Sequence, residues 1–491
     1  MNLLRLLLCP GLLFGLAECR SNDPEPIVVV DRTDTLSLAR VRALAEFSVP
    51  SSIQVTDPGM EGTFQADVGD RESPDNTGTI LVTANGVRYK RAFSGPASAA
   101  WFGVSEADDD VGPELQVAVN VVDDVVVPDG TYTQRTLVRL RSGMTLRGNP
   151  GKVLFRLPAS YTALANPIDH SIHLRDVVID GLAWEVTTRE DGRFGLIYID
   201  TPSVTNLTIR NCRSTDEAAK DSTNWLTVKL PAGKTGRNIV VENNTVRAKR
   251  MGCEIFNHDN FNQYAGSAIT VRNNAFSNCY FGISLSGPLD SLTVTDNRLK
   301  DCAHYGIEIA GAARRVVIVG NTFEGRFDKF LIGSNDGGGN GSVVGGMVVE
   351  NNRTLGQCQG GVQLYNGGTV QFRKNDFSMT GTLELLHSTN GGLFTENRIE
   401  STANKAIICD NTANHTFRDN VLSTEKSPGN QAVVMAYGNR AINNSLINNK
   451  LIKGPGGKYY EAVEGGSLRA TQNFDGQGNP LAGPEGATNG R

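Results

Sequence analysis

The sequence predicts an all-β solenoid, in which short strands coil around one axis, preceded by a small N-terminal β module. The first observation behind this prediction is a column of asparagines that recurs at intervals of 22 to 31 residues. The second is their frame, since most of them lie three positions after one apolar residue and two before another. The third is composition, because 54 glycines and only 7% aromatic residues suit many tight turns. The column comprises Asn244, Asn274, Asn297, Asn321, Asn352, Asn375, Asn397, Asn420 and Asn449.

The repeat excludes two other architectures. A period near 23 residues is too short for a strand–helix–strand unit, and the frame of leucine-rich repeats is absent. What remains is a coil of two or three short strands, each stacked on its equivalent one turn later.

Residues 1–19 are predicted to be a secretory signal peptide, because Arg5 supplies positive charge and residues 6–17 form a short apolar run. No other stretch is apolar enough to cross a bilayer, so we expect a secreted or cell-surface bacterial protein without a membrane span. The segment ahead of Cys19 is similar to a lipoprotein box, but Glu18 stands where such a box has a small residue. A lipid anchor on Cys19 therefore stays an open alternative.

Residues 20–45 are predicted to be a linker and a short helix, since Leu38, Val41 and Leu44 have roughly helical spacing. Residues 46–105 are predicted to form strands around Gly, Asn and Asp turns, which makes this segment the small β module.

Residues 106–465 are predicted to form the solenoid. Near its start, Leu115, Val117 and Val119 alternate as in a strand, although a short helix also fits this stretch. Residues 466–491 are polar and rich in glycine, so we expect a flexible tail.

Composition also restricts partners and cofactors. The formal net charge is -5, with acidic and basic residues spread along the chain, so we expect no nucleic-acid partner. Eight cysteines are present, but none forms a CxxC pair. We therefore expect no metal site, and we interpret the cysteines of the repeats as buried, reduced thiols. The oligomeric state stays open.

Alternation along the predicted strands separates buried from exposed side chains. In the stretch YGIEIA it places Ile307 and Ile309 inside the solenoid and Glu308 outside. The asparagine column is assigned to an internal ladder at a sharp corner, where asparagine tolerates left-handed backbone. Its amide can bond to the asparagines above and below, so we expect the column to have a structural role.

The stretch from Trp101 to Gly151 contains WFGV, LQVAV, VVVPDGTYT and LVRLRSGMTLRGNPG. It resembles the entry cap and first coils of pectate-lyase-like and tailspike-like proteins. With the repeat frame, the resemblance to the right-handed parallel β-helix of the pectate-lyase-like superfamily covers about residues 100–460. It implies a secreted protein with a polysaccharide partner, either an enzyme that cleaves the polysaccharide or an adhesin that binds it. The fold alone does not choose between them.

Strands aligned in register predict two outward columns of side chains, with neighbouring coils stacked at about 4.8 Å. The first column comprises Tyr198, Thr227, Glu254, Ser284, Glu308, Leu331, Gln363 and Glu384. The second comprises Asp200, Lys229, Phe256, Ser286, Ala310, Gly333, Tyr365, Leu386 and Asp410.

Two carboxylates of the first column are the candidates for catalysis. Glu254 and Glu308 lie two coils apart, with roughly 10 Å between their backbones. Inverting glycosidases hold their carboxyls about 6.5 to 9.5 Å apart to seat a water. In this hypothesis one glutamate protonates the leaving oxygen and the other activates water, while the small Ser284 keeps the groove open. Asp259 or Asp200 could replace either glutamate.

Other residues are candidates for binding the substrate or moving a proton. Phe256 and Tyr365 could stack on sugar rings, unless loops cover them. Lys229, together with Asp200, could contact the glycan, and His258 could transfer a proton, although a turn histidine also serves to hydrogen-bond the backbone.

Two alternative functions stay open beside hydrolysis, which needs no cofactor. A lyase would perform β-elimination on a uronic-acid glycan, which requires a base and a positive partner for the carboxylate, either a basic side chain or Ca²⁺. We prefer hydrolysis because the paired Asp and Arg motifs of pectate lyases are absent, although the motif set of polygalacturonases is absent too. The other alternative is a non-catalytic adhesin or tailspike-like surface protein that only binds a glycan.

Overall fold

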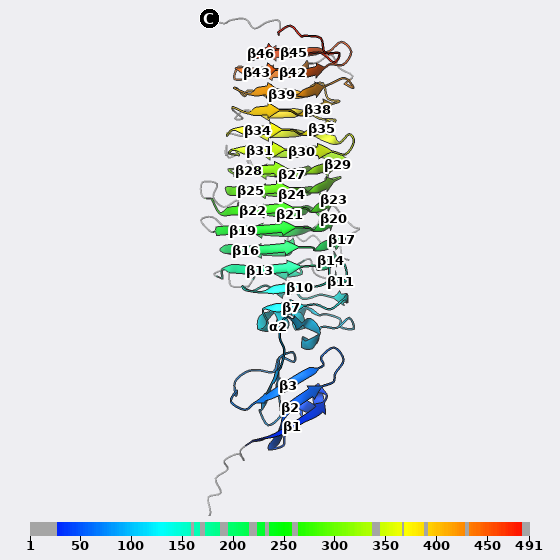
Figure 1. The fold of residues 1–491 in the computed structure, drawn as a ribbon, viewed down its shortest axis with the longest axis vertical. Helices are drawn as coiled ribbons and strands as arrows, with labels where there is room; N and C mark the ends of the chain where they lie inside the picture. The colour runs from blue at the N-terminus through cyan, green and yellow to red at the C-terminus, as the bar shows by residue number, and fades with distance from the viewer. Residues whose placement is uncertain are drawn as a thin grey trace, which may run out of the picture. The chain divides into compact units, whose positions relative to one another are not determined.

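The computed structural model describes residues 27–158, 162–166, 172–186, 195–215, 223–230, 235–257, 264–335, 344–365, 368–386, 391–427 and 432–483. The chain divides into two compact units, Met1–Ala92 and Phe93–Arg491. Figure 1 shows the small sheet of the first unit in blue and the long stack of coils of the second from cyan to red.

The N-terminal unit is one five-stranded sheet with a short helix. In spatial order its strands are β1 (Val28–Leu36), β2 (Ser48–Val55), β3 (Gly62–Asp67), β5 (Arg88–Arg91) and β4 (Ile80–Val82), and α1 (Leu38–Arg42) connects β1 to β2. β1 pairs with β2 in parallel, and the other neighbours are antiparallel. The core of this unit packs around Val41, Ile53, Phe64, Leu81 and Tyr89.

The prediction for residues 20–45 requires a correction. Residues 28–36 form strand β1 rather than a linker, because their backbone pairs with β2 up to Leu36 opposite Val55. The helix is shorter than its apolar spacing indicates. It begins after Ser37, whose hydroxyl accepts from the backbone N–H of Arg40, and ends at Arg42.

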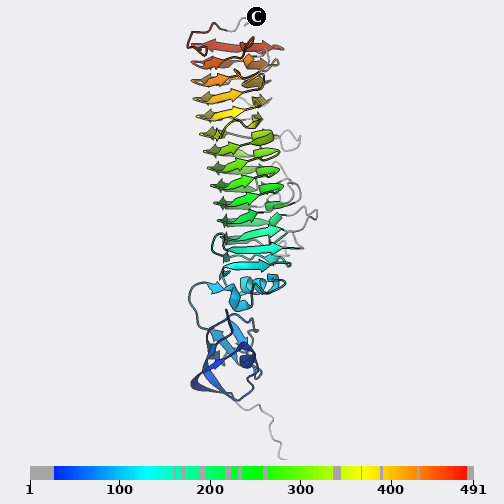
Figure 2. The same ribbon diagram turned by 90° about the vertical axis from the view of Figure 1, so that its right-hand side faces the viewer.

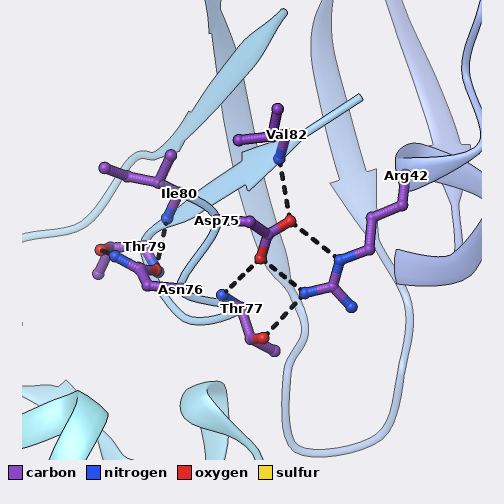
Figure 3. A network of polar contacts seen from close by, with 7 residues as sticks. All are labelled: Arg42, Asp75, Asn76, Thr77, Thr79, Ile80 and Val82. Atoms are coloured by element: carbon purple, nitrogen blue, oxygen red, sulfur yellow. Dashed lines mark hydrogen bonds and ion pairs between the residues drawn. The ribbon is translucent and has the colours of Figure 1, made fainter. Parts of the chain in front are cut away.

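A carboxylate fastens α1 to the loop ahead of β4, as Figure 3 shows. Asp75 accepts hydrogen bonds from Arg42 Nε at 2.9 Å and Nη2 at 2.7 Å, and from the backbone N–H groups of Thr77 and Val82. Burial alone raises the pKa of Asp75, but these hydrogen bonds outweigh it and hold the pKa below its ordinary value of 3.8. The charged carboxylate therefore stabilises the unit.

The second unit is built from three parallel sheets. Apart from β6, which pairs with β7, each strand pairs with the strand three places later in chain order, so successive coils contribute one strand to each sheet. Figure 2 shows the coils stacked along one axis. Before the first coils lie the 3-10 helix η1 (Ala99–Phe102) and the helix α2 (Gly112–Val121), which covers the stretch where strand and helix were both open.

Sheet 1 contains β6 (Ala97–Ser98), β7 (Asp124–Val126), β10 (Thr145–Arg147), β13 (Leu174–Asp180), β16 (Ser203–Arg210), β19 (Thr235–Glu242), β22 (Gly266–Arg272), β25 (Leu289–Thr295), β28 (Arg314–Val319), β31 (Met347–Glu350), β34 (Val370–Arg373), β37 (Leu393–Thr395), β40 (Thr416–Arg418), β43 (Asn444–Ile447) and β46 (Leu468–Thr471).

Sheet 2 contains β8 (Gly130–Thr133), β11 (Val153–Leu157), β14 (Ala183–Val186), β17 (Arg213–Thr215), β20 (Thr245–Arg247), β23 (Ala275–Ser277), β26 (Arg298–Lys300), β29 (Thr322–Glu324), β32 (Arg353–Thr354), β35 (Asp376–Met379), β38 (Arg398–Ser401), β41 (Val421–Ser423) and β44 (Lys450–Ile452).

Sheet 3 contains β9 (Val138–Arg139), β12 (Leu164–Ala165), β15 (Gly195–Asp200), β18 (Asn224–Lys229), β21 (Met251–Phe256), β24 (Phe281–Ser286), β27 (Tyr305–Ala310), β30 (Arg326–Asn335), β33 (Gln359–Tyr365), β36 (Leu383–Leu386), β39 (Ile407–Asp410), β42 (Ala432–Tyr437) and β45 (Lys458–Val463).

Both ends of the solenoid extend past the predicted boundaries. β6 pairs with β7, so sheet 1 begins before residue 106. At the other end, β46 pairs with β43, and buried Leu468 and Asn473 anchor a further coil inside the stretch predicted to be a flexible tail. The polar composition of this stretch therefore does not exclude a folded coil.

The predicted alternation is confirmed. Ile307 and Ile309 of β27 are fully buried in the apolar core of the solenoid, whereas Glu308 between them is partly exposed. Six free cysteines of the described coils are also buried, as expected: Cys212, Cys253, Cys279, Cys302, Cys358 and Cys409.

The asparagine column forms the predicted buried ladder. Each side-chain oxygen accepts both the backbone N–H and the Nδ2 of the column residue one coil earlier, as Asn297 does from Asn274 at 3.0 Å for both bonds. Each Nδ2 also donates to a backbone carbonyl, as Asn274 does to Val241 at 2.9 Å. The ladder runs from the backbone N–H of Cys212 to Asn473.

One detail of the ladder prediction is wrong. The left-handed backbone does not belong to the column itself but to the residue before it, as at Asn243 (φ 57°), Asn273 (φ 56°) and Asp296 (φ 56°). The preceding residue makes the sharp corner, and this turns the column asparagine inward, where its amide finds its partners.

A first prediction concerns the ladder. Asn352→Ala should lower the free energy of unfolding by about 2–5 kcal/mol, because it leaves the buried backbone N–H of Asn321 without its acceptor and removes the bonds of Asn352 to Asn321 Nδ2 and to the carbonyl of Ile318. Thermal unfolding followed by circular dichroism measures this change. The matched control is Asn351→Gly at the exposed left-handed position (φ 53°), which should shift stability by no more than about 0.5 kcal/mol. Equal effects of the two substitutions would contradict the ladder as the main anchor.

A second prediction concerns Asp75. Asp75→Asn should speed amide hydrogen exchange in residues 28–91 of the full chain, measured by mass spectrometry, because it removes a charged acceptor of four hydrogen bonds. The folded-state pKa is lowered, so the stabilisation is fully present above the ordinary value of 3.8 and is lost as the pH falls through the folded-state pKa. The difference between wild type and variant should therefore shrink on acidification. A difference that grows instead would refute this role.

Candidate functional site

The outer face of sheet 3 carries the two predicted columns, with one correction. Pairing places Thr227 beside Glu254, Glu254 beside Ser284, and Ser284 beside Glu308. One coil further, the residue in register with Glu308 is Gly333 rather than Leu331, and Asn335 rather than Gly333 pairs with Ala310. The predicted register is wrong by two because β27 pairs with β30 from Tyr305 opposite Phe330 onward, and Leu331 is completely buried.

Glu254 is held by uncharged donors. Its Oε2 accepts a hydrogen bond from Asn224 Nδ2 at 2.7 Å and another from Thr227 Oγ1 at 3.1 Å, and both donors are buried. Burial raises the pKa of Glu254 above its ordinary value, and the negative charge of Glu308 raises it further. The bond from Thr227 and the charge of Arg250 act in the opposite direction without cancelling the rise. Glu254 is therefore suited to carry a proton at a higher pH than an ordinary glutamate.

Glu308 is held by a similar pair of donors from the coils on either side. Ser284 Oγ donates to Oε2 at 2.7 Å, and Asn335 Nδ2 donates to Oε1 at 3.0 Å. Ser284 is only 3% exposed, so the hydroxyl that donates to Glu308 is buried. Both carboxylate oxygens of Glu308 thus have fixed partners, which orient the group.

The two glutamates share one face of one sheet. They are separated by two coils, or about 10 Å between backbones. The influence of Glu308 on the pKa of Glu254 is further indication that the carboxyls interact. Ser284 of the intervening coil lies between the two glutamates.

Three neighbours of this pair are absent from the sequence-based candidates. Asn224 and Asn335 bind the carboxylates, and Tyr305 lies beside Glu308. The ring of Tyr305 covers Gly333, where a Cβ atom would lie 2.4 Å from the ring. Burial and the charge of Glu308 raise the pKa of this tyrosine to about 12. Asn335 belongs to β30, where the predicted register is wrong, whereas Asn224 and Tyr305 stand at the first positions of β18 and β27, outside the two predicted columns.

Aromatic rings stack at the entrance to the strands of sheet 3. Tyr280 and His304 are parallel at 4.8 Å, and Phe281 and Tyr305 are nearly parallel at 5.4 Å. Rings stacked on one another stabilise neighbouring coils, so His304 has a packing role at this corner.

In the second column, side chains that were predicted to bind the substrate already contact each other or lie far apart. Lys229 Nζ lies 3.6 Å from Asp200 Oδ2, to which the hydroxyl of Tyr198 also donates at 3.3 Å. Phe256 and Tyr365 are half-buried and stand four coils apart, about 19 Å, so they do not share one sugar-binding position.

Two further candidates cannot be placed. His258 and Asp259 lie outside the described residues, as does Cys19. Within the described ranges, no group of three or more His, Cys, Asp or Glu side chains is arranged to hold a metal ion. Among the same residues, no helix has the length and apolar character needed to cross a membrane.

Two family models match the sequence. The model of the right-handed beta helix region matches residues 196–377, which include the carboxylate pair. The model of the phage tail protein small four-stranded beta-sheet domain matches residues 37–94. No curated protein matches the chain.

Several solved structures have a similar fold. The tailspike protein of Acinetobacter baumannii phage AM24 is 16% identical, with 88% of this chain and 65% of that chain covered and a TM-score of 0.40. Pantoea stewartii WceF, a glycan biofilm modifying enzyme with a tailspike-like parallel β-helix, is 14% identical, with 68% and 48% covered and a TM-score of 0.45. The Streptococcus pneumoniae surface protein and adhesin PfbA is 12% identical, with 75% and 100% covered and a TM-score of 0.42.

This likeness carries over no activity, substrate or partner, since all three proteins are at most 16% identical to the chain. The chain also spans less than two thirds of the length of the phage tailspikes that it matches. The match of residues 196–377 to the right-handed beta helix region, the three parallel sheets and the buried asparagine ladder together support a parallel β-helix superfamily.

Proposed function

We propose that the chain hydrolyses a polysaccharide on the outer face of sheet 3, with Glu254 as general acid and Glu308 as general base. The observation that carries this proposal is the environment of the pair. Both carboxylates lie two coils apart on one face, and each accepts bonds from an amide and a hydroxyl. The raised pKa of Glu254 suits protonation of the leaving oxygen, while Glu308 would activate water.

A lyase is supported less well. β-Elimination requires a positive group beside the uronic carboxylate, yet the lysine in the second column, Lys229, is already paired with Asp200. The hydrolase needs no metal, whereas Ca²⁺ would enter the chemistry only as the positive partner in a lyase.

A second candidate function is that of a tailspike-like glycan binder. The observation that favours it is the match of residues 37–94 to a phage tail protein domain. In that role the solenoid would attach to a surface glycan, with or without cleaving it. In either case we expect the protein to act outside a bacterial cell or at its surface, and lipidation of Cys19 stays a proposal.

Reducing-end release and the ultraviolet absorbance of unsaturated uronates, measured over a panel of polysaccharides, distinguish these functions. New reducing ends without absorbance support hydrolysis, and both signals together indicate a lyase. Binding without either signal indicates an adhesin.

A third prediction tests the pair directly. Glu254→Gln and Glu308→Gln should each lower kcat by about 10²–10⁴-fold, because each removes one proton-transfer group while keeping the size of the side chain. The control Glu242→Gln removes a carboxylate that pairs with Arg272 on sheet 1 and should keep full activity. Full activity in both Glu254→Gln and Glu308→Gln would exclude the pair from the mechanism.

A fourth prediction concerns pH. As general acid, Glu254 must be protonated, so kcat/KM should fall as the pH rises through its raised pKa. The hydrogen bond from Thr227 favours the charged form, so Thr227→Val should move this alkaline limb to higher pH. The pH profile of kcat/KM for wild type and variant measures the shift. An alkaline limb that stays in place, or moves to lower pH, speaks against Glu254 as the acid.

A further inference from the structure

A hollow of about 660 Å³ opens on the same outer face of sheet 3, over β39, β42 and β45. Its floor is a grid of two outward columns across three successive coils, as the strand register shows. The first column contributes Ile408, Met435 and Glu461, and the second contributes Asp410, Tyr437 and Val463. Lys405 and Glu464 complete the lining.

The lining combines an apolar floor with a few oriented polar groups, as small-molecule sites do. Ile408, Met435 and Val463 supply the apolar surface, and the ring of Tyr437 stands among them. The hydroxyl of Tyr437 is hydrogen-bonded to Glu464, which orients the ring. A flat aromatic ring beside aliphatic carbons suits the C–H face of a sugar.

The charges of the hollow select among glycans. Asp410, Glu461 and Glu464 line it against one ammonium group, that of Lys405. Glu461 is also paired with Lys458 at 2.9 Å, so the three carboxylates of the lining outnumber the two lysines. Carboxylates are acceptors for hydroxyl groups, so they suit sugar hydroxyls, whereas a uronic-acid chain would meet like charge.

The hollow is separate from the carboxylate pair. β39 lies four coils beyond β27, which is about 19 Å along the sheet from Glu308. Glu384 lies between them, one coil before β39 in the same column as Glu308, and accepts from Gln363 Nε2 at 3.2 Å. A polysaccharide lying along the columns could therefore contact both places at once.

We propose that this hollow is a second glycan-binding site, which takes uncharged, hydroxyl-rich sugar units. Tyr437 and Met435 pack against the sugar ring, and Asp410 accepts its hydroxyl groups. The site binds whether or not the pair at Glu254 and Glu308 cleaves the chain.

A glycan array first identifies neutral oligosaccharides that bind the full chain carrying Glu308→Gln. Calorimetric titration of this variant then measures its affinity for those oligosaccharides and for uronic-acid oligosaccharides of similar length. Tyr437→Ala should weaken binding of the neutral ligand about tenfold or more, while Tyr437→Phe, which keeps the ring, should change it by less than about threefold. Asp410→Asn should also weaken it. The control Asp376→Asn, at an exposed aspartate of sheet 2, should have no effect.

Each contrary result overturns the proposal. The first is that no neutral glycan binds on the array, and the second is that Tyr437→Ala and Asp410→Asn leave binding unchanged. The third is that uronic-acid oligosaccharides bind more tightly than neutral ones. The fourth is that the protein binds CaCl₂ and Asp410→Asn abolishes this binding, which would make the hollow a calcium site. Cleavage assays on the wild type in parallel keep the two proposals apart. If Tyr437→Ala weakens binding but the wild type cleaves nothing, only the catalytic role of the carboxylate pair is rejected. If the wild type cleaves a glycan, and neither Tyr437→Ala nor Asp410→Asn changes cleavage or binding, only the proposal for the hollow is rejected.

Discussion

The hydrogen bonds between stacked asparagine amides are the constraint on which the rest of the solenoid depends. Each column residue accepts two hydrogen bonds from the column residue one coil earlier and donates to the one a coil later. The corner that contains the asparagine is therefore aligned from one coil to the next. Glu254 and Glu308 come to lie on one face through the pairing of β21, β24 and β27 within sheet 3.

The architecture could be predicted from the sequence because a short period with an apolar frame leaves few ways to bury the strands. The outward columns were also predictable wherever a coil has its ordinary length. They failed at β30, where pairing with β27 places Gly333, and not the buried Leu331, beside Glu308. The donors Asn224 and Asn335 could not be predicted from the sequence for a related reason. They are 30 and 27 residues from the glutamates they bind, and only the three-dimensional register brings them together.

The two glutamates illustrate how a solenoid gives similar side chains different properties. Alternation along β21 and β27 places both outward, and both accept from an amide and a hydroxyl. Glu254 receives its bonds from donors in a single neighbouring strand, whereas Glu308 is bound from the coils on both sides. Burial then favours the neutral form of Glu254. The difference arises from neighbours contributed by other coils, so substitutions there can tune the chemistry without touching either glutamate.

The coils that carry the ladder are interchangeable in one respect, since each adds one strand to each of the three sheets and one amide to the internal stack. Duplication or loss of a whole coil would therefore preserve inside and outside while moving everything downstream by a single step of about 4.8 Å. The separation between the carboxylate pair and the acidic hollow is thus a whole number of such steps. A gene encoding this protein could change the distance between these two places by adding or deleting repeats, with the side chains at either place left intact.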